Sequence, residues 1–147
     1  MIGRIQSELR GSLRAGDRTR TNALRLLLSA LQKAEKDRPA GEFGEAEEQA
    51  VLRRERKQRV EAAETYRAAG HEERAAAEEA DLPVIDEFLP APLSEAELES
   101  LVDAAVADSG ATSIRDMGAV MKLVSERSGG RADGRAASAL VRARLQT

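Results

Sequence analysis

Leucine, valine and alanine recur along this chain at the spacing of one face of an α-helix, and this pattern limits the folds open to it. The clearest stripe is Leu24, Leu27, Leu28 and Leu31, since a helix turns once in about 3.6 residues. No stretch shows the strict alternation of a half-buried strand. Only 2% of the residues are aromatic, so the core must be aliphatic. Because alanine, leucine, glutamate and arginine favour helices, the sequence predicts an all-α protein.

An N-terminal helical domain of about four helices is expected in residues 1–89. The helices should cover about 2–15, 19–37, 45–69 and 72–88, separated by glycine and proline. Asp17 or Thr19 can cap the second, and Gly70 suits the C-terminal end of the third. Pro83 should kink or break the fourth because it lacks a backbone N–H. The apolar faces expected for the first and third helices are Ile2, Ile5, Leu9 and Leu13, and Ala50, Val51, Val60, Ala63 and Tyr66.

A proline pair marks the expected domain boundary. Pro90 and Pro92 forbid a continuing helix, so residues 90–93 are predicted to be a stiff linker. Ser94 and Glu97 then have the spacing of a capping box. Residues 94–147 should form a small C-terminal three-helix bundle, with turns at the glycines of 110 and 129–130.

The sequence lacks the signals that are typical of secreted and membrane proteins. It has no cysteine, no run of apolar residues long enough to cross a bilayer, and no signal-peptide pattern at its N-terminus. We therefore expect a cytoplasmic protein with no membrane partner. The net charge of −3 is unevenly spread: residues 1–40 hold nine Lys/Arg against four Asp/Glu, whereas residues 41–92 hold seven against fourteen. This asymmetry suits a protein that meets a polyanion with selected faces, and equally an ordinary solvated helical surface.

Signatures of catalysis are missing. There is no thiol nucleophile, no glycine-rich phosphate loop with lysine, and no Gly-x-Ser-x-Gly. The single histidine, His71, has no second His or Cys to join it at a metal, and the acidic clusters are better explained as ion pairs with arginine. We predict no catalytic residue, no metal site and no cofactor.

Basic residues provide two candidate anion sites. On the third helix, Arg53, Arg56 and Lys57 fall on one side and can either bind phosphate or pair with nearby glutamates. Near the C-terminus, Arg131 and Arg135 flank a helix N-terminus, whose amides favour phosphate. The preferred site is residues 130–135, with an ordinary interhelix turn as the alternative. Further candidates are Lys122, Arg127 and Arg142.

Six segments, in order, resemble the GatB/YqeY family. They are Arg25-Leu26-Leu27 to Ala30-Leu31, Lys57-Gln58-Arg59, Tyr66 to Gly70, Phe88-Leu89-Pro90 with Leu93-Ser94-Glu95, Asp116-Met117-Gly118 with Val120-Met121, and Gly130 to Gly134. The chain departs from the pattern at Ala119, where the family usually has lysine, and at Pro83.

The resemblance implies a function. Stand-alone members are similar to the tail of the B subunit of the glutamyl/aspartyl-tRNA amidotransferase, a helical appendage that contacts tRNA. It therefore implies a non-catalytic tRNA-associated accessory protein, working beside an amidotransferase or a synthetase. The family label of carbon–nitrogen ligase activity with glutamine as donor is then inherited from the larger subunit. Two alternatives stay open: a helical protein-interaction module without RNA affinity, and a ligase component that depends on a partner.

Overall fold

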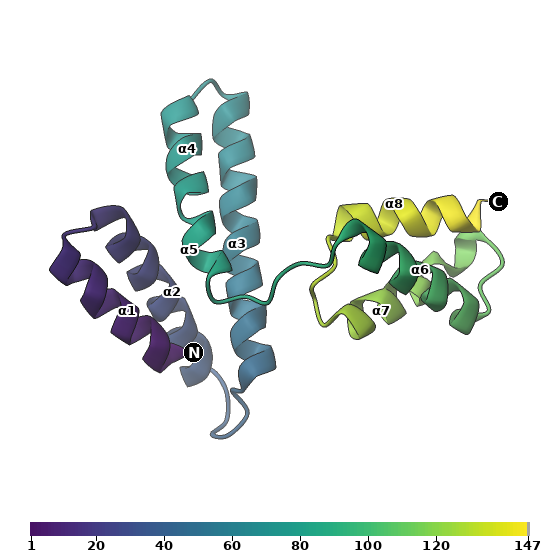
Figure 1. Cartoon of the computed structure of the whole chain (residues 1–147), viewed down its shortest axis with the longest axis horizontal. Coiled ribbons are helices and arrows are strands. Elements are labelled where there is room, and N and C mark those ends of the chain that lie inside the picture. The colour runs from purple at the N-terminus through teal and green to yellow at the C-terminus, as the bar shows by residue number, and fades with distance from the viewer. Residues whose placement is uncertain (147) are drawn as a thin grey trace. The chain divides into compact units, whose positions relative to one another are not determined.

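The computed structural model describes residues 1–146, and these residues form helices joined by short turns (Figure 1). No strand occurs among them, which confirms the all-α prediction. The chain divides into two compact units: the N-terminal unit is Met1–Leu89 and the C-terminal unit begins at Pro90. No helix within the described range is both long enough and apolar enough to traverse a bilayer.

The N-terminal unit combines two helical hairpins. Helix α1 (Ile2–Ala15) packs along α2 (Arg18–Lys36), and α2 in turn contacts the long helix α3 (Glu45–Ala68). The chain then returns beside α3 as α4 (Glu72–Ala80) and α5 (Leu82–Asp86), the latter also touching α2 (Figure 1). Helix α2 is therefore covered on more than one side, which explains its dense leucine content.

Local signals fix the ends of these helices. The Asp17 carboxylate caps α2 by accepting a hydrogen bond from the Arg20 backbone N–H at 3.0 Å. Gly16, just before it, has φ +71°, a conformation that glycine adopts without a Cβ penalty, and it closes α1. Gly70 follows α3 with φ +80°, as expected.

The helix expected over residues 72–88 is two helices. The break falls at Asp81, which ends α4 and precedes α5. Pro83 lies in the first turn of α5, where its missing N–H would have had no intrahelical partner. Proline therefore begins a helix here, and the predicted break is confirmed with a sharper boundary.

The core of the N-terminal unit is aliphatic. Its fully buried side chains include Ile5, Leu24, Leu27, Leu52 and Ile85. The expected apolar stripes hold with two corrections. Leu13 is 50% exposed, because α1 packs mainly on α2 and no third helix covers its last turn. Ala50 is also exposed, while Leu52 and Arg59 are buried, since α3 is contacted by α2, α4 and α5 together.

The C-terminal unit is a bundle in which α6 (Glu95–Ser109), α7 (Met117–Ser128) and α8 (Gly134–Leu145) contact one another pairwise. A short 3₁₀ turn, η1 (Ile114–Asp116), leads into α7. The capping box at Ser94 and Glu97 forms in both directions, at 3.0 and 3.1 Å. The bundle core consists of Leu98, Val102, Ala105, Val120, Val124, Ala137, Val141 and Leu145.

The segment after Leu89 is held by the C-terminal unit. The Leu93 backbone N–H donates to the Arg131 carbonyl at 3.1 Å, and Arg131 Nε donates to the Ala91 carbonyl at 2.7 Å. The Leu93 side chain packs against the bundle core. These contacts fasten two residues of the predicted linker, Ala91 and Leu93, to the C-terminal unit.

Candidate nucleic-acid interface

The basic residues of α3 are largely neutralised. Arg56 makes a two-pronged contact with Asp86, with Nε–Oδ1 at 2.7 Å and a second nitrogen at 3.2 Å from Oδ2. That hydrogen bond raises the pKa of the Arg56 guanidinium. Arg53 donates to the side-chain oxygen of Gln49 at 3.0 Å. Lys57 extends into solvent, 76% exposed and 3.9 Å from Glu61, and Arg54 is exposed as well. The α3 cluster therefore offers less free charge than its sequence indicates.

Arg59, two residues beyond Lys57, has a structural role. It is 6% exposed and binds Glu55 at 2.9 Å and Asp81 at 3.2 Å. Asp81 stands at the junction of α4 and α5. The side chain therefore ties α3 to that junction, and it is unavailable to a ligand.

Several C-terminal arginines are also engaged within their own unit. Arg127 pairs with Asp108 at 2.7 Å, and Arg144 pairs with Asp103 at 2.6 Å. The hydrogen bond that Arg144 donates to Asp103 raises the pKa of the Arg144 guanidinium. Arg131 is held by the Ala91 carbonyl. Of these three, only Arg131 lacks a carboxylate partner among the described residues, and its Nε is nevertheless in use.

The helix N-terminus predicted as the preferred anion site already holds an acid. Asp133 caps α8, and its carboxylate accepts from the Arg135 backbone N–H at 2.9 Å. A phosphate at the same amides would meet this negative charge. The turn before it uses Gly129 and Gly130, both with positive φ. Residues 130–135 are therefore built as a capped interhelix turn, and what they offer to an anion is the Arg135 side chain.

Three of the predicted cations remain open to solvent. Lys122, Arg135 and Arg142 are exposed, and within residues 1–146 their side chains have no hydrogen bond or ion pair. We call these residues the C-terminal cation set. Arg135 and Arg142 lie seven residues apart on α8, so they face the same side about 10 Å apart. That side lies away from the face that buries Ala137 and Val141. Lys122 belongs to α7, and Arg115 of η1 is similarly exposed.

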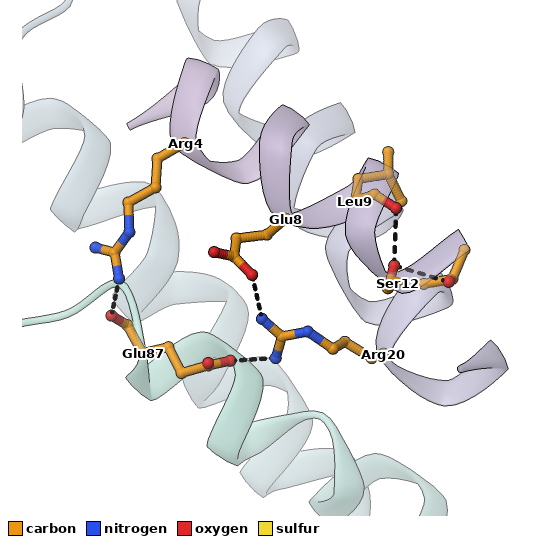
Figure 2. A network of polar contacts seen from close by, with 7 residues as sticks. Arg4, Glu8, Leu9, Ser12, Arg20 and Glu87 are labelled. Carbon is orange, nitrogen blue, oxygen red and sulfur yellow. Dashed lines mark hydrogen bonds and ion pairs between the residues drawn. The ribbon is translucent and has the colours of Figure 1, made fainter. Parts of the chain in front are cut away.

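A second group of open cations lies on the α1–α2 hairpin. Arg20 bridges Glu8 at 3.0 Å and Glu87 at 2.5 Å (Figure 2). Its pKa is raised chiefly by the hydrogen bond to Glu87. In contrast, Arg10, Arg14, Arg18 and Arg25 are exposed and have no such partner in the described chain. The sequence analysis named none of these four arginines as a candidate. The excess of basic residues in 1–40 was the feature that could have pointed to them.

The described residues hold no cluster of His, Cys, Asp or Glu that could bind a metal ion. His71 lies exposed at the N-cap of α4, and its side chain makes no capping hydrogen bond.

Sequence comparison defines the family. No curated protein is significantly similar to this chain. The sequence pattern of the Yqey-like protein family, however, matches residues 2–145. The match runs through both compact units and includes all six segments noted above. The chain therefore belongs to the Yqey-like protein family.

Proposed function

We propose that this protein is a non-catalytic accessory that binds RNA, with tRNA as its target, through the C-terminal cation set. The observation that carries this proposal is the selective lack of counter-ions. Arg127 and Arg144 each have an aspartate within 2.7 Å, whereas Lys122, Arg135 and Arg142 have none among the described residues. Cations left exposed in this way are the groups that contact a phosphate backbone.

The chemistry of the C-terminal unit favours recognition of shape. The aromatic residues Phe43, Tyr66 and Phe88 all lie in residues 1–89, so the bundle has no ring on which a base could stack. Arginine and lysine contacts to phosphate and sugar position a protein on a folded RNA without reading its sequence. A tRNA body fits such a surface better than a single strand does.

The resemblance to the amidotransferase tail supports the same target. The tail contacts tRNA while chemistry takes place elsewhere, and this chain contains no cysteine to release ammonia from glutamine. An amidotransferase or a synthetase is the natural neighbour on a shared tRNA. Any ligase activity would then come from that neighbour.

The proposal is tested by fluorescence anisotropy with bulk tRNA at about 50 and 200 mM salt. The variant is Lys122→Ala/Arg135→Ala/Arg142→Ala. Removing three phosphate contacts should lower the slope of log affinity against log salt by about 2–3. The matched control is Arg53→Ala/Arg56→Ala/Lys57→Ala, which removes the same charge from α3, where Arg56 and Lys57 already have carboxylate partners.

The control should leave the slope nearly unchanged. Equal losses in both variants would mean that net charge alone drives binding, and the C-terminal cation set would lose its role. If wild-type protein binds tRNA no better than an acidic control protein at low salt, RNA binding itself is refuted.

A protein-interaction role is the second candidate. It is favoured by the exposed leucines of the α1–α2 hairpin, Leu13 at 50% and Leu26 at 53%. Large apolar side chains in such positions gain nothing from phosphate but gain from a protein partner.

A further inference from the structure

A shallow groove lies where the end of α1 meets the start of α2. Leu13 and Gly16 of the α1 end, with Arg18, Asn22 and Arg25 of α2, form much of its lining. Its floor includes the hydroxyls of Ser12 and Thr21, which hydrogen-bond to each other at 2.9 Å, and Ser12 also donates to the Leu9 carbonyl. Figure 2 shows Ser12 making these contacts inside the hairpin. The two hydroxyls at the floor thus already have hydrogen-bond partners, so a ligand need not provide any.

The rim of the groove carries uncompensated positive charge. Arg18 and Arg25 are exposed with no ion pair in the described part of the chain. Arg10 and Arg14, on the last turns of α1 but not among the lining residues, are likewise exposed and unpaired within residues 1–146. The one acid in the groove, Asp17, is occupied in capping α2. Four other arginines of this unit, Arg20, Arg56, Arg59 and Arg67, have carboxylate partners. Arg54 on α3 is exposed without one in the described residues.

Leu13 adds apolar surface to this charged rim. It is half exposed and is not among the residues packed against the core of its unit. Only Leu13, Leu26 and Ile114 are large apolar residues with such exposure in residues 1–146. Burying a leucine removes water from it and stabilises a complex, so a ligand with its own apolar face gains from this position.

We propose that this groove binds an acidic amphipathic helix of a partner protein. A seam between two antiparallel helices accepts a third helix that inserts its apolar stripe, as in other helix-in-groove complexes. Acidic residues flanking that stripe would meet Arg18 and Arg25, which line the groove. Charge complementarity then sets orientation and association rate, while Leu13 supplies buried contact.

The observations favour this occupant over RNA and over a second copy of the chain. Neither α1 nor α2 contains an aromatic residue for base stacking, and leucine offers nothing to a phosphate. The acidic α3–α4 hairpin of another copy would match the charge, but it presents no exposed large apolar side chain among the described residues. The inference also stands apart from RNA binding, because it uses none of the C-terminal cation set.

The test is an NMR titration of the ¹⁵N-labelled full-length protein with a synthetic helix of about 18 residues, five turns long. The peptide has leucine at positions i, i+3, i+4 and i+7, glutamate on either side of this stripe, and alanine at the remaining positions so that it stays helical. A scrambled peptide of the same composition and bulk tRNA are the comparison ligands. Leu13→Ser and Arg25→Glu alter the groove. Leu26→Ser and Arg54→Glu are matched controls of equal chemistry outside it.

The amphipathic peptide should shift the amides at the end of α1 and the start of α2. Leu13→Ser and Arg25→Glu should each weaken its binding by about tenfold, and the two controls by less than about twofold. The proposal is overturned if the scrambled peptide binds as tightly, if groove and control variants behave alike, if tRNA shifts the groove amides more strongly than the peptide, or if no peptide binds. The C-terminal triple variant, with tRNA, reports on the RNA proposal separately.

Discussion

The buried Arg59 allows the sharpest test of the fold, through the substitution Arg59→Met. Methionine keeps much of the volume of the side chain but removes its charge. The change leaves Glu55 and Asp81, whose side chains are only 18% and 17% exposed, without their common cation. It also removes the donor to the Glu55 carbonyl at 3.0 Å. Two partly buried carboxylates would then face each other across the α3–α4/α5 junction.

The size of the effect follows from burial. Removing one partner of a buried ion pair costs about 3–5 kcal/mol, because the remaining charge is left uncompensated. Since both carboxylates keep some access to water, the lower end of that range applies, about 3 kcal/mol. In a unit of this size each kcal/mol moves the unfolding midpoint by about 4–8 °C, so we expect a fall of about 15 °C.

Tyrosine fluorescence gives a clean readout of this change. Tyr66 is the only tyrosine and the chain has no tryptophan. It lies near the end of α3, with the Arg74 guanidinium 5.9 Å from its ring centre. Its emission therefore follows the unfolding of the N-terminal unit alone, in heat or in urea, even when the C-terminal unit melts separately.

Arg56→Met is the matched control. It removes the same side chain from the same helix and also deprives an aspartate of its partner, but Arg56 and Asp86 are 40% and 48% exposed. Exposed pairs contribute about 0–1 kcal/mol. If Arg59→Met costs no more than Arg56→Met, the reasoning from burial is wrong.

Three further predictions use local features. Gly11→Ala, within α1, should stabilise the N-terminal unit by about 0.5–1 kcal/mol, whereas Gly16→Ala, at φ +71°, should destabilise it by about 1 kcal/mol. Both are measured by Tyr66 emission, and a change in unfolding free energy of the same sign in the two variants would contradict this. Ser94→Ala removes the cap of α6 and should cost about 1 kcal/mol, seen as faster amide exchange in its first turn. The hydrogen bond from Arg67 lowers the pKa of Glu79, so this contribution is present at neutral pH and lost as the pH falls through the lowered value. Wild type and Glu79→Gln should then differ in unfolding midpoint at pH 7 and converge in acid, and a constant gap would refute the linkage.

The positions of the helices were readable from the sequence because their signals are local. The capping box of Ser94 and Glu97, the Asp17 cap and the terminating glycines act within about four residues, and each formed where it was expected. The aliphatic periodicity of α2 likewise gave its buried residues Leu24, Leu27 and Leu31. The same locality made the boundary in residues 72–88 harder to place, since proline can either end a helix or begin one.

The candidate site depended on tertiary structure. Arg56, Lys57 and Arg59 stand within four residues, yet one pairs with an aspartate 30 positions away, one is open to solvent and one is buried. Arg131 finds a carbonyl 40 positions away. Sequence fixes how many cations a chain carries and on which helix they stand. Which of them keep a free charge depends on acids brought close only by folding, because an ion pair forms over a few ångströms regardless of separation along the chain.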